Sequence, residues 1–398
     1  MTETWAHRAD LAESAVTERH AKKLWGMPKT NLAVVTWPPG LKDHLFWHWH
    51  YWWQAQYLDC QVDAALRRGT KTRRRRIADT LRGIQRRNRG KLTANLHYDD
   101  KAWLTLAWNR ATQLDGIKRT RALGELEFDL LAGIDPVTGV LPWRKGETFY
   151  NVPSNAPAAI IFATTGRLDK AREIVDWIFD NLVREDGLLD DGIRMRMSGP
   201  EVVDKVYTYN QGTVLGASLE IALALREDVG LDHDEPIDSF EYSERADASM
   251  FYITHIRAIV QSVALDLATP QGVLVSPPQE SGEGDGGLFK GILARYLAEV
   301  ALRLPADSKE NIATKKIAAR LVMQSAESLW SHRLEVDGLP VFAAEWTQDA
   351  KLPHNYGLGP SSISEAVGLV RIDERDLSVQ LSGWMLLEAA AKVAAMEA

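Results

Sequence analysis

Apolar residues recur along this chain mainly with helical spacing. Positions i, i+3, i+4 and i+7 repeat in most segments, whereas the strict alternation of apolar and polar residues that is typical of strands is scarce. We therefore predict an all-α fold. The predicted helices cover residues 8–25, 41–67, 74–88, 100–114, 117–132, 155–165, 168–183, 211–226, 244–267, 286–303, 308–330, 362–370 and 376–396.

Long connectors rich in turn-forming residues separate these helices. They are residues 135–147, 184–192, 269–287 and 336–362. Connectors of this length within one domain are usually functional, and they alternate here with paired helices. We expect helical hairpins whose loops build a site at one end of a barrel. No change of composition marks a second domain, so we expect one domain over 1–398, with 1–40 as an N-terminal helical extension.

The composition, 45% hydrophobic and 25% charged residues, is that of an ordinary globular protein. The formal net charge of −7 argues against nucleic acid as the main partner, because phosphate binding requires a basic footprint. Cys60 is the single cysteine and cannot form an internal disulfide. The first twenty residues do not have the pattern of a secretory signal, and no apolar run approaches a membrane span, so we expect a cytoplasmic protein.

Two adjacent carboxylates, Asp99 and Asp100, precede a predicted helix. One aspartate is enough to cap a helix. A second one adds repulsion unless one of the two holds a proton, and such a pair can supply an acid and a base at neutral pH. Retaining glycosidases place two carboxyl groups about 5 to 5.5 Å apart, a separation that neighbouring residues can reach. Capping and catalysis are both open interpretations of this pair.

Aromatic residues flank the pair, with Tyr98 before it and Trp103 after it. Aromatic faces stack on pyranose rings, although core packing explains aromatic residues equally well. A second adjacent pair, Asp190 and Asp191, lies between glycines. Because turn chemistry explains acids there, we favour the first pair.

Amide side chains open two further predicted helices. Asn155 follows Ser154 at one of them, and Asn210 with Gln211 begins another. These amides could cap their helices, or they could bind sugar hydroxyls at a barrel mouth.

A glycine-rich loop precedes the helix predicted at 286–303. Its spacing to Lys290 and the lack of a following Ser or Thr exclude a phosphate loop. We expect this loop to deliver Asp285, Phe289 and Lys290 to a cleft.

Histidines and aromatic residues crowd the stretch 43–60. His44 and His48 are four residues apart, but no third metal ligand is evident. Four residues nearby fit one helical stripe, which favours a barrel-lining helix: Trp49, Trp52, Trp53 and Gln56. We expect neither a metal nor an organic cofactor.

Residues 67–91 hold twelve basic residues and one acid, Asp79. An apolar stripe within this stretch predicts an amphipathic helix with a solvated basic face. The alternative is that the helix at 73–89 contacts an anionic surface, such as phospholipid head groups that carry a glycan.

Five motifs give the chain its resemblance to a known family. They are WQAQYLD (53–59), YDDKAW (98–103), SNAPAA (154–159), YTYNQGTVLGA (207–217) and GDGGLFKGILARYL (284–297). In this order they resemble glycoside hydrolase family 76, the family of endo-α-1,6-mannanases, from about residue 45 to 350.

The resemblance implies an (α/α)6 barrel of six hairpins and a retaining reaction on α-1,6-mannan, with no cofactor. Asp99 matches the family's nucleophile and Asp100 its general acid/base. We also expect a monomer. The expected substrate-binding residues, most of them carried over from the motifs, are Tyr98, Trp103, Asn155, Asp204, Tyr209, Asn210, Gln211, Asp285, Phe289, Lys290 and Trp346.

Three functions remain open at this stage. The first is the retaining endo-mannanase, acting on fungal-wall mannan or on bacterial lipomannan. The second is another sugar enzyme on the same barrel, an inverting hydrolase or an epimerase. The third is a non-catalytic protein that binds α-mannan or lipoglycan. Two departures from the family pattern bear on this choice, namely the lack of an export signal and the basic helix at 73–89.

Overall fold

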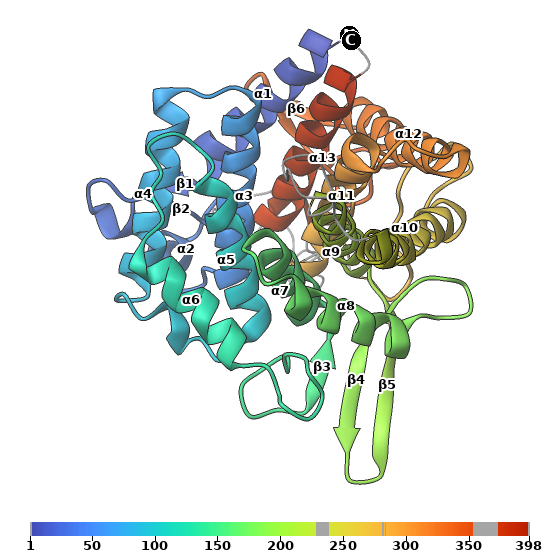
Figure 1. The fold of residues 1–398 in the computed structure, drawn as a ribbon. Helices are drawn as coiled ribbons and strands as arrows, with labels where there is room; N and C mark the ends of the chain where they lie inside the picture. Colours follow the sequence, from blue (N-terminus) through green and yellow to red (C-terminus); the bar gives the residue numbers. More distant parts are fainter. Residues whose placement is uncertain (1, 228–238, 281, 283, 353–372, 397–398) are drawn as a thin grey trace.

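Two concentric rings of helices form the body of the protein (Figure 1). The computed structural model describes residues 2–227, 239–280, 282, 284–352 and 373–396. In the inner ring each helix contacts the next, and the last contacts the first. The inner helices are α3 (Tyr51–Arg67), α5 (Tyr98–Ala111), α7 (Val152–Thr164), α9 (Thr208–Glu227), α11 (Phe289–Arg303) and α13 (Leu377–Met396).

The outer ring supplies one antiparallel partner to each inner helix. The outer helices are α4 (Lys71–Arg87), α6 (Arg121–Ala132), α8 (Leu168–Leu182), α10 (Ser239–Asp266) and α12 (Lys309–Ser331), which pack on α3, α5, α7, α9 and α11, and α1 (Thr2–His20), which packs on α13. This arrangement is an (α/α)6 barrel and confirms the predicted fold class. The predicted extension, 1–40, thus supplies α1 to the outer ring.

Burial explains which helices lie inside. Almost every residue of α7 from Val152 to Phe162 is buried, as expected of a helix surrounded by protein. Helix α8 instead buries one stripe, which includes Ile174 and Ile178. Inner helices also approach closely, because a Cβ on Gly212 of α9 would lie 2.7 Å from the Cα of Leu293 on α11.

The predicted helices agree with the observed ones apart from two differences near the N-terminus. The helix predicted at 8–25 is observed at Thr2–His20, and residues 21–22 form a short strand instead. The segment 41–67 was expected to be continuous, but it divides into the short α2 (Leu41–His44) and α3. Between them Phe46 and His50 have φ values of 52° and 41°, which no helix allows. The helix predicted at 362–370 lies outside the described residues.

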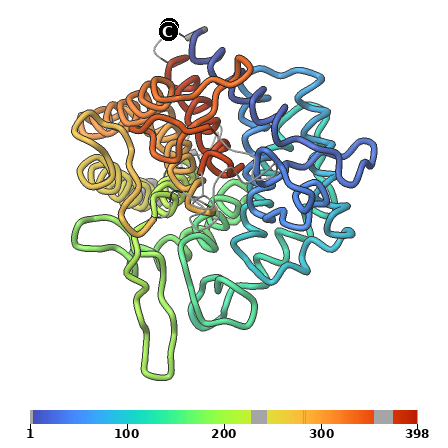
Figure 2. Tube along the Cα trace, turned by 180° about the vertical axis from the view of Figure 1, so that it is seen from behind, coloured from blue at the N-terminus to red at the C-terminus, as the bar shows by residue number. Residues whose placement is uncertain are grey.

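Short strands lie in the connectors between the helices, and the sequence pattern did not predict them. The largest sheet joins β3 (Phe149–Asn151), β4 (Asp190–Arg196) and β5 (Gly199–Val206). Its β4–β5 hairpin projects from the barrel, as Figure 2 also shows from behind. The other strands form two small pairs, β1 (Ala21–Lys22) with β2 (Leu32–Ala33) and β6 (Leu334–Val336) with β7 (Leu339–Val341). Most side chains of β5 are at least partly exposed, so it carries no apolar alternation to detect.

The basic helix α4 is partly neutralised by its neighbour α1. Arg73 is buried and bonds to Glu13 of α1, and Arg76 pairs with the same carboxylate at 2.9 Å. Asp10 accepts from Arg68 at 2.7 Å. The first half of α4 is therefore a packing surface. Among the described residues, no helix is long and apolar enough to cross a membrane.

Candidate active site

A cleft of about 500 Å³ lies where the inner helices begin. The second residue of four inner helices lines it, because all these helices start at the same end of the barrel. These residues are Trp52 of α3, Asp99 of α5, Pro153 of α7 and Tyr209 of α9. The first residue of α11, Phe289, joins them. This end of the barrel was the predicted place for a site.

Aromatic rings form a continuous wall of the cleft. Tyr209 stacks on Phe289 with centroids 3.9 Å apart, and Trp103 stacks on Tyr209 at 6.4 Å. Trp52 lies 6.2 Å from both Trp103 and Phe289. Such a surface suits the apolar faces of sugar rings.

Asp99 lines the cleft and is held from two sides. One carboxyl oxygen accepts a hydrogen bond from the backbone N–H of Asp100 at 2.8 Å, and the other accepts from the indole N–H of Trp143 at 2.9 Å. Burial raises the pKa of Asp99 to about 6, and its hydrogen bonds oppose this rise. The carboxyl group can therefore exchange a proton near neutral pH.

Asp100 lies beside Asp99 but is not among the residues that line the cleft. Consecutive helical side chains point about 100° apart, so Asp100 leaves the helix in a different direction from Asp99. The Nδ2 of Asn95 donates to Asp100 at 2.7 Å. Burial, followed by the charge of Asp99, raises the pKa of Asp100 to about 7. Of the two acids, Asp100 keeps its proton to the higher pH.

Two further carboxylates line the cleft. Asp285 accepts hydrogen bonds from the indole N–H groups of Trp52 and Trp53, at 2.9 and 2.7 Å. Asp191 accepts from Nδ2 of Asn210 at 3.0 Å, and burial raises the pKa of Asp191 to about 6. Asp285 was predicted from its loop, whereas Asp191 was assigned to turn chemistry.

A β-bulge explains why Asp191 was missed. The register of β4 shifts between Asp190 and Gly192, so the adjacent acids separate. Asp190 pairs with Arg184 at 2.6 Å outside the cleft, and Asp191 lines the cleft. The sequence sign of this bulge is Gly192, since a glycine within a strand often marks a bulge or a close approach of another backbone. The structure shows such an approach, because a Cβ on Gly192 would lie 2.3 Å from the carbonyl oxygen of Tyr150.

The predicted amide residues act on the protein backbone. Asn155 accepts from the N–H of Leu141 and donates to its carbonyl, both at 2.8 Å. Gln211 holds Leu189 in the same way, with both bonds at 3.0 Å. Both amides are fully buried and neither lines the cleft, so the expectation of direct sugar contact is corrected to one of positioning.

These clamps form a structural repeat that the sequence search did not detect. The fourth residue of four inner helices is an amide that grips the N–H and C=O of one residue in the connector before its helix. The pairs are Gln54 with Ala33, Asn155 with Leu141, Gln211 with Leu189 and Gln380 with Phe342. Each clamp fixes where a connector enters the cleft end of the barrel.

The remaining predicted residues do not line the cleft. Tyr98 is buried, and the ammonium of Lys101 lies 3.8 Å from its ring centre. Asn210 is fully buried and donates a hydrogen bond to Asp191. Lys290 donates to Glu345 at 2.9 Å and lies 5.5 Å from the ring centre of the buried Trp346. Asp204 is exposed on β5, where it pairs with Arg184.

The same cleft contains residues for which sequence reasoning gave no signal. Trp143 comes from the connector 135–147 and holds Asp99. Arg194 of β4 places its guanidinium 4.6 Å from the ring centre of Phe149. Both are carried by segments without helical periodicity.

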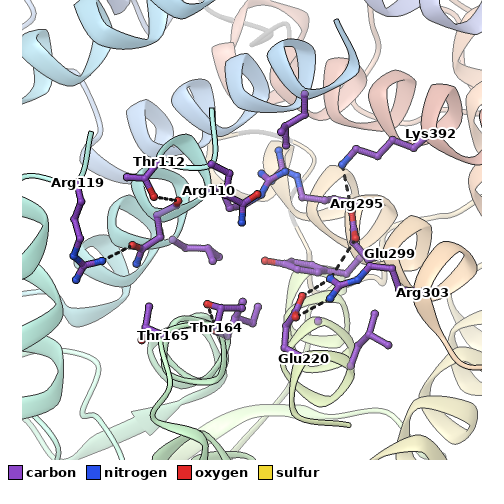
Figure 3. Close-up of a pocket in the computed structure, with 18 residues that line it drawn as sticks. Arg110, Thr112, Arg119, Thr164, Thr165, Glu220, Arg295, Glu299, Arg303 and Lys392 are labelled. Atoms are coloured by element: carbon purple, nitrogen blue, oxygen red, sulfur yellow. Dashed lines mark hydrogen bonds and ion pairs between the residues drawn. The ribbon is translucent and has the colours of Figure 1, made fainter. Parts of the chain in front are cut away.

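A second cavity, of about 410 Å³, lies toward the opposite end of the inner helices (Figure 3). Its charged side chains pair with one another. Lys392 bonds to Glu299 at 3.3 Å, and Arg303 pairs with Glu220. Arg110 donates to Asp63 at 2.6 Å. With its charged side chains engaged in ion pairs and no aromatic wall, this cavity does not resemble a sugar site.

No group of three His, Cys, Asp or Glu residues in the described part of the chain could hold a metal ion. The cleft offers carboxyl groups and aromatic rings.

A helical barrel whose inner helices begin at an aromatic cleft with paired, proton-exchanging carboxyl groups has the architecture of a glycoside hydrolase. The comparisons with known proteins give the family. The chain belongs to glycosyl hydrolase family 76, whose model matches residues 10–366. A comparison with curated protein sequences finds no match.

Solved structures agree with this assignment. The GH76A α-1,6-mannanase of Salegentibacter sp. HEL1_6 is 26% identical, with 98% of this chain and 99% of that chain covered and a TM-score of 0.73. An inactive variant of that enzyme, with two neighbouring aspartates replaced by asparagine, was solved with α-1,6-mannotriose (25% identity, 98% and 99% covered, TM-score 0.72). Dfg5 of Chaetomium thermophilum, solved with glucosamine, shares the fold at 16% identity (86% and 82% covered, TM-score 0.58).

Proposed function

We propose that this protein is a retaining, endo-acting glycoside hydrolase that cleaves α-1,6-mannosidic linkages. The observation that carries the proposal is the pair Asp99 and Asp100 at the start of α5, with raised pKa values and an aromatic cleft beside them. The Salegentibacter α-1,6-mannanase supports it, because replacing two neighbouring aspartates gave an inactive variant of that enzyme.

In the first step, Asp99 attacks the anomeric carbon and the bond from C1 to the O6 oxygen of the next mannose breaks. The proton of Asp100 passes to that oxygen, so the departing chain leaves as an alcohol. The indole N–H of Trp143 orients the attacking carboxylate. Asp99 accepts two hydrogen bonds that favour its charged form, whereas Asp100 accepts one and feels the charge of Asp99, which favours this division of roles over the reverse.

In the second step, water replaces Asp99 at C1. The carboxylate of Asp100 takes the proton from that water, and the mannose product leaves with its original anomeric configuration. Asp100 must reach the reacting oxygen from the edge of the cleft. Asn95 binds one of its carboxyl oxygens, which leaves the other for proton transfer.

Asp191 and Asp285 bind hydroxyl groups of the sugar in this proposal. Both line the cleft, and each has a carboxyl oxygen fixed by a protein N–H, which pre-orients the group for a substrate. The stacked rings of Trp103, Tyr209 and Phe289 bind the pyranose faces.

Digestion of linear α-1,6-mannan, with products sized over time, tests the proposal. Internal cleavage predicts an early ladder of oligomers, and proton NMR of the first product predicts the α anomer. Release of mannose alone would contradict endo action, and an initial β anomer would contradict retention. Binding of mannan without any product would instead favour the non-catalytic function.

A further inference from the structure

A cluster of large apolar side chains is exposed near the cleft end of the barrel. Trp25, Leu41, Leu45 and Trp47 are 53%, 78%, 51% and 72% exposed. They come from two segments, the turn around residues 24–26 and the stretch from α2 to α3. Single exposed apolar residues are common, but four large ones in neighbouring segments are not.

Hydrogen bonds join these segments to the end of helix α4 in one surface. The indole N–H of Trp25 donates to the carbonyl oxygen of Leu45 at 2.8 Å. Arg87 of α4 donates to the carbonyl oxygen of Phe46 at 3.1 Å, and its guanidinium lies 5.1 Å from the ring centre of Trp49. The apolar side chains and the end of α4 are therefore held side by side.

Basic residues lie in the same segments as the apolar side chains and at the end of α4. The exposed ones are Lys23, Lys29, Lys42, Arg86, Arg89 and Lys91. The acids in these segments are already engaged, since Asp43 accepts from Thr36 at 2.8 Å and Asp79 pairs with Arg82 at 2.6 Å. The rest of the molecule carries the opposite charge, because the whole chain has a formal net charge of −7. We call these ten exposed residues the basic apolar patch.

The position of the patch relates it to the cleft. Trp52, which lines the cleft, follows Trp47 by five residues at the start of α3. Helix α4 follows α3 after a short turn and packs back on it, so the last residues of α4 lie at the end of the barrel where α3 begins. Figure 1 shows α2 beside these two helices. The patch is thus part of the cleft end, whereas Arg73 and Arg76 in the first half of α4 pair with Glu13 of α1.

We infer that the basic apolar patch docks the protein onto an anionic phospholipid bilayer. Tryptophan and leucine side chains enter the boundary between head groups and acyl chains, and lysine and arginine attract anionic head groups. Reversible binding needs both contributions, and the patch offers both. A second copy of the chain would bring two positive surfaces together, and neutral mannan would gain nothing from six cations.

Docking in this way brings the cleft end of the barrel close to the lipid surface. If the proposed hydrolysis holds, glycans anchored in that bilayer become the accessible substrates. The lipid binding itself does not depend on the hydrolysis, so the two are tested separately.

Co-sedimentation with vesicles tests the docking. We expect the protein to pellet with phosphatidylcholine vesicles that contain about 30 mol% phosphatidylglycerol, to stay in solution with phosphatidylcholine alone, and to be released by high salt. The variant Leu41→Ser/Trp47→Ser removes the apolar part, and Lys23→Gln/Lys42→Gln/Arg86→Gln removes half of the exposed charge. Each should lower the bound fraction about tenfold or more.

The matched control is Leu265→Ser/Lys118→Gln, which changes an exposed leucine and an exposed lysine outside the patch. It should bind vesicles like the wild type. Thermal melting and hydrolysis of soluble α-1,6-mannotriose should be unchanged in all three variants, which separates lost docking from lost folding or catalysis. The inference is overturned if the wild type does not pellet, if the patch variants bind as well as the control, or if the apolar variant instead loses self-association or affinity for mannan.

Discussion

At the scale of single residues, the environment of two neighbouring carboxyl groups decides their chemistry. Asp99 accepts two hydrogen bonds that favour its charged form, whereas Asp100 accepts one from Asn95 and feels the charge of Asp99. Adjacent acids thereby acquire different proton affinities. This difference is the physical basis of the proposed division into nucleophile and acid.

The roles of the two acids predict different responses to the leaving group. Asp99→Asn should lower kcat by several orders of magnitude on every substrate, since it removes the attacking group. Asp100→Asn should still form the mannosyl-enzyme quickly from 2,4-dinitrophenyl α-mannoside, because that leaving group needs no proton. The measurement is the burst of dinitrophenol in stopped flow. A burst with Asp99→Asn and none with Asp100→Asn would reverse the assignment.

The raised pKa values also predict a stability change with pH. At about pH 3 and below, both carboxyl groups hold their protons in the folded state and almost always in the unfolded state, whose aspartate pKa is about 3.9. As pH rises, the unfolded chain loses these protons first, so the wild type loses stability until the pH passes the folded values of about 6 and 7. Asp99→Asn/Asp100→Asn should therefore be more stable than the wild type by several kcal/mol, about 7 at most, at about pH 8 and nearly equal to it at about pH 3.

Urea unfolding at the two pH values measures this difference. The exposed Asp115 provides the control, and Asp115→Asn should change little at either pH. A double variant that is less stable than the wild type at the higher pH would show that the carboxylates stabilise the fold, contrary to the account.

The sequence predicted those residues of the site that lie in or beside segments with helical periodicity. Asp99, Trp103, Tyr209 and Phe289 lie in or at the start of predicted helices, and all line the cleft. Asp191 lies on a strand whose bulge redirects it, a feature set by the tertiary pairing of β4. Local pattern cannot report such a pairing.

At the scale of secondary-structure elements, the amide clamps link four connectors to the inner helices that follow them. The prediction of helices succeeded because inner and outer helices both bury long apolar stripes. The break after α2 and the β4–β5 hairpin were missed, since positive φ values and exposed strands leave no periodic signal. The clamps were not detected because single amides at positions 54, 155, 211 and 380 are unevenly spaced and form no sequence repeat.

Removing one clamp should damage both stability and catalysis. Asn155→Ala leaves the buried N–H and C=O of Leu141 without partners, which costs about 2 to 4 kcal/mol. It also loosens the connector that carries Trp143, so kcat should fall more than KM rises. Asn181→Ala is the control, because Asn181 is exposed and bonds only within its own helix. Unchanged unfolding of Asn155→Ala in urea would contradict the clamp.

At the scale of the whole molecule, ion pairs away from the cleft connect four inner helices. Asp63 of α3 binds Arg110 of α5 at 2.6 Å, Arg295 of α11 at 2.9 Å and Lys392 of α13 at 3.0 Å. Burial alone would raise the pKa of Asp63, but these three cations hold it well below its ordinary value. The network closes the ring between its first and last helices.

Breaking this network should be far more costly than breaking an ion pair at the surface. Asp63→Ala leaves three cations without their shared partner and should destabilise the fold by about 3 to 5 kcal/mol. Asp307→Ala, which removes a surface pair with Arg226, should cost less than about 1 kcal/mol. Urea unfolding compares the two, and equal losses would contradict the structural role given to Asp63.

The central claim is that Asp99 forms a covalent bond to mannose during turnover. The most direct measurement is peptide mapping by mass spectrometry after the protein reacts with 2-deoxy-2-fluoro-α-mannosyl fluoride and is quenched in acid. The account predicts one fluoromannosyl group, attached to Asp99. A label on Asp100 or Asp191, or turnover of the reagent without any label, would contradict it.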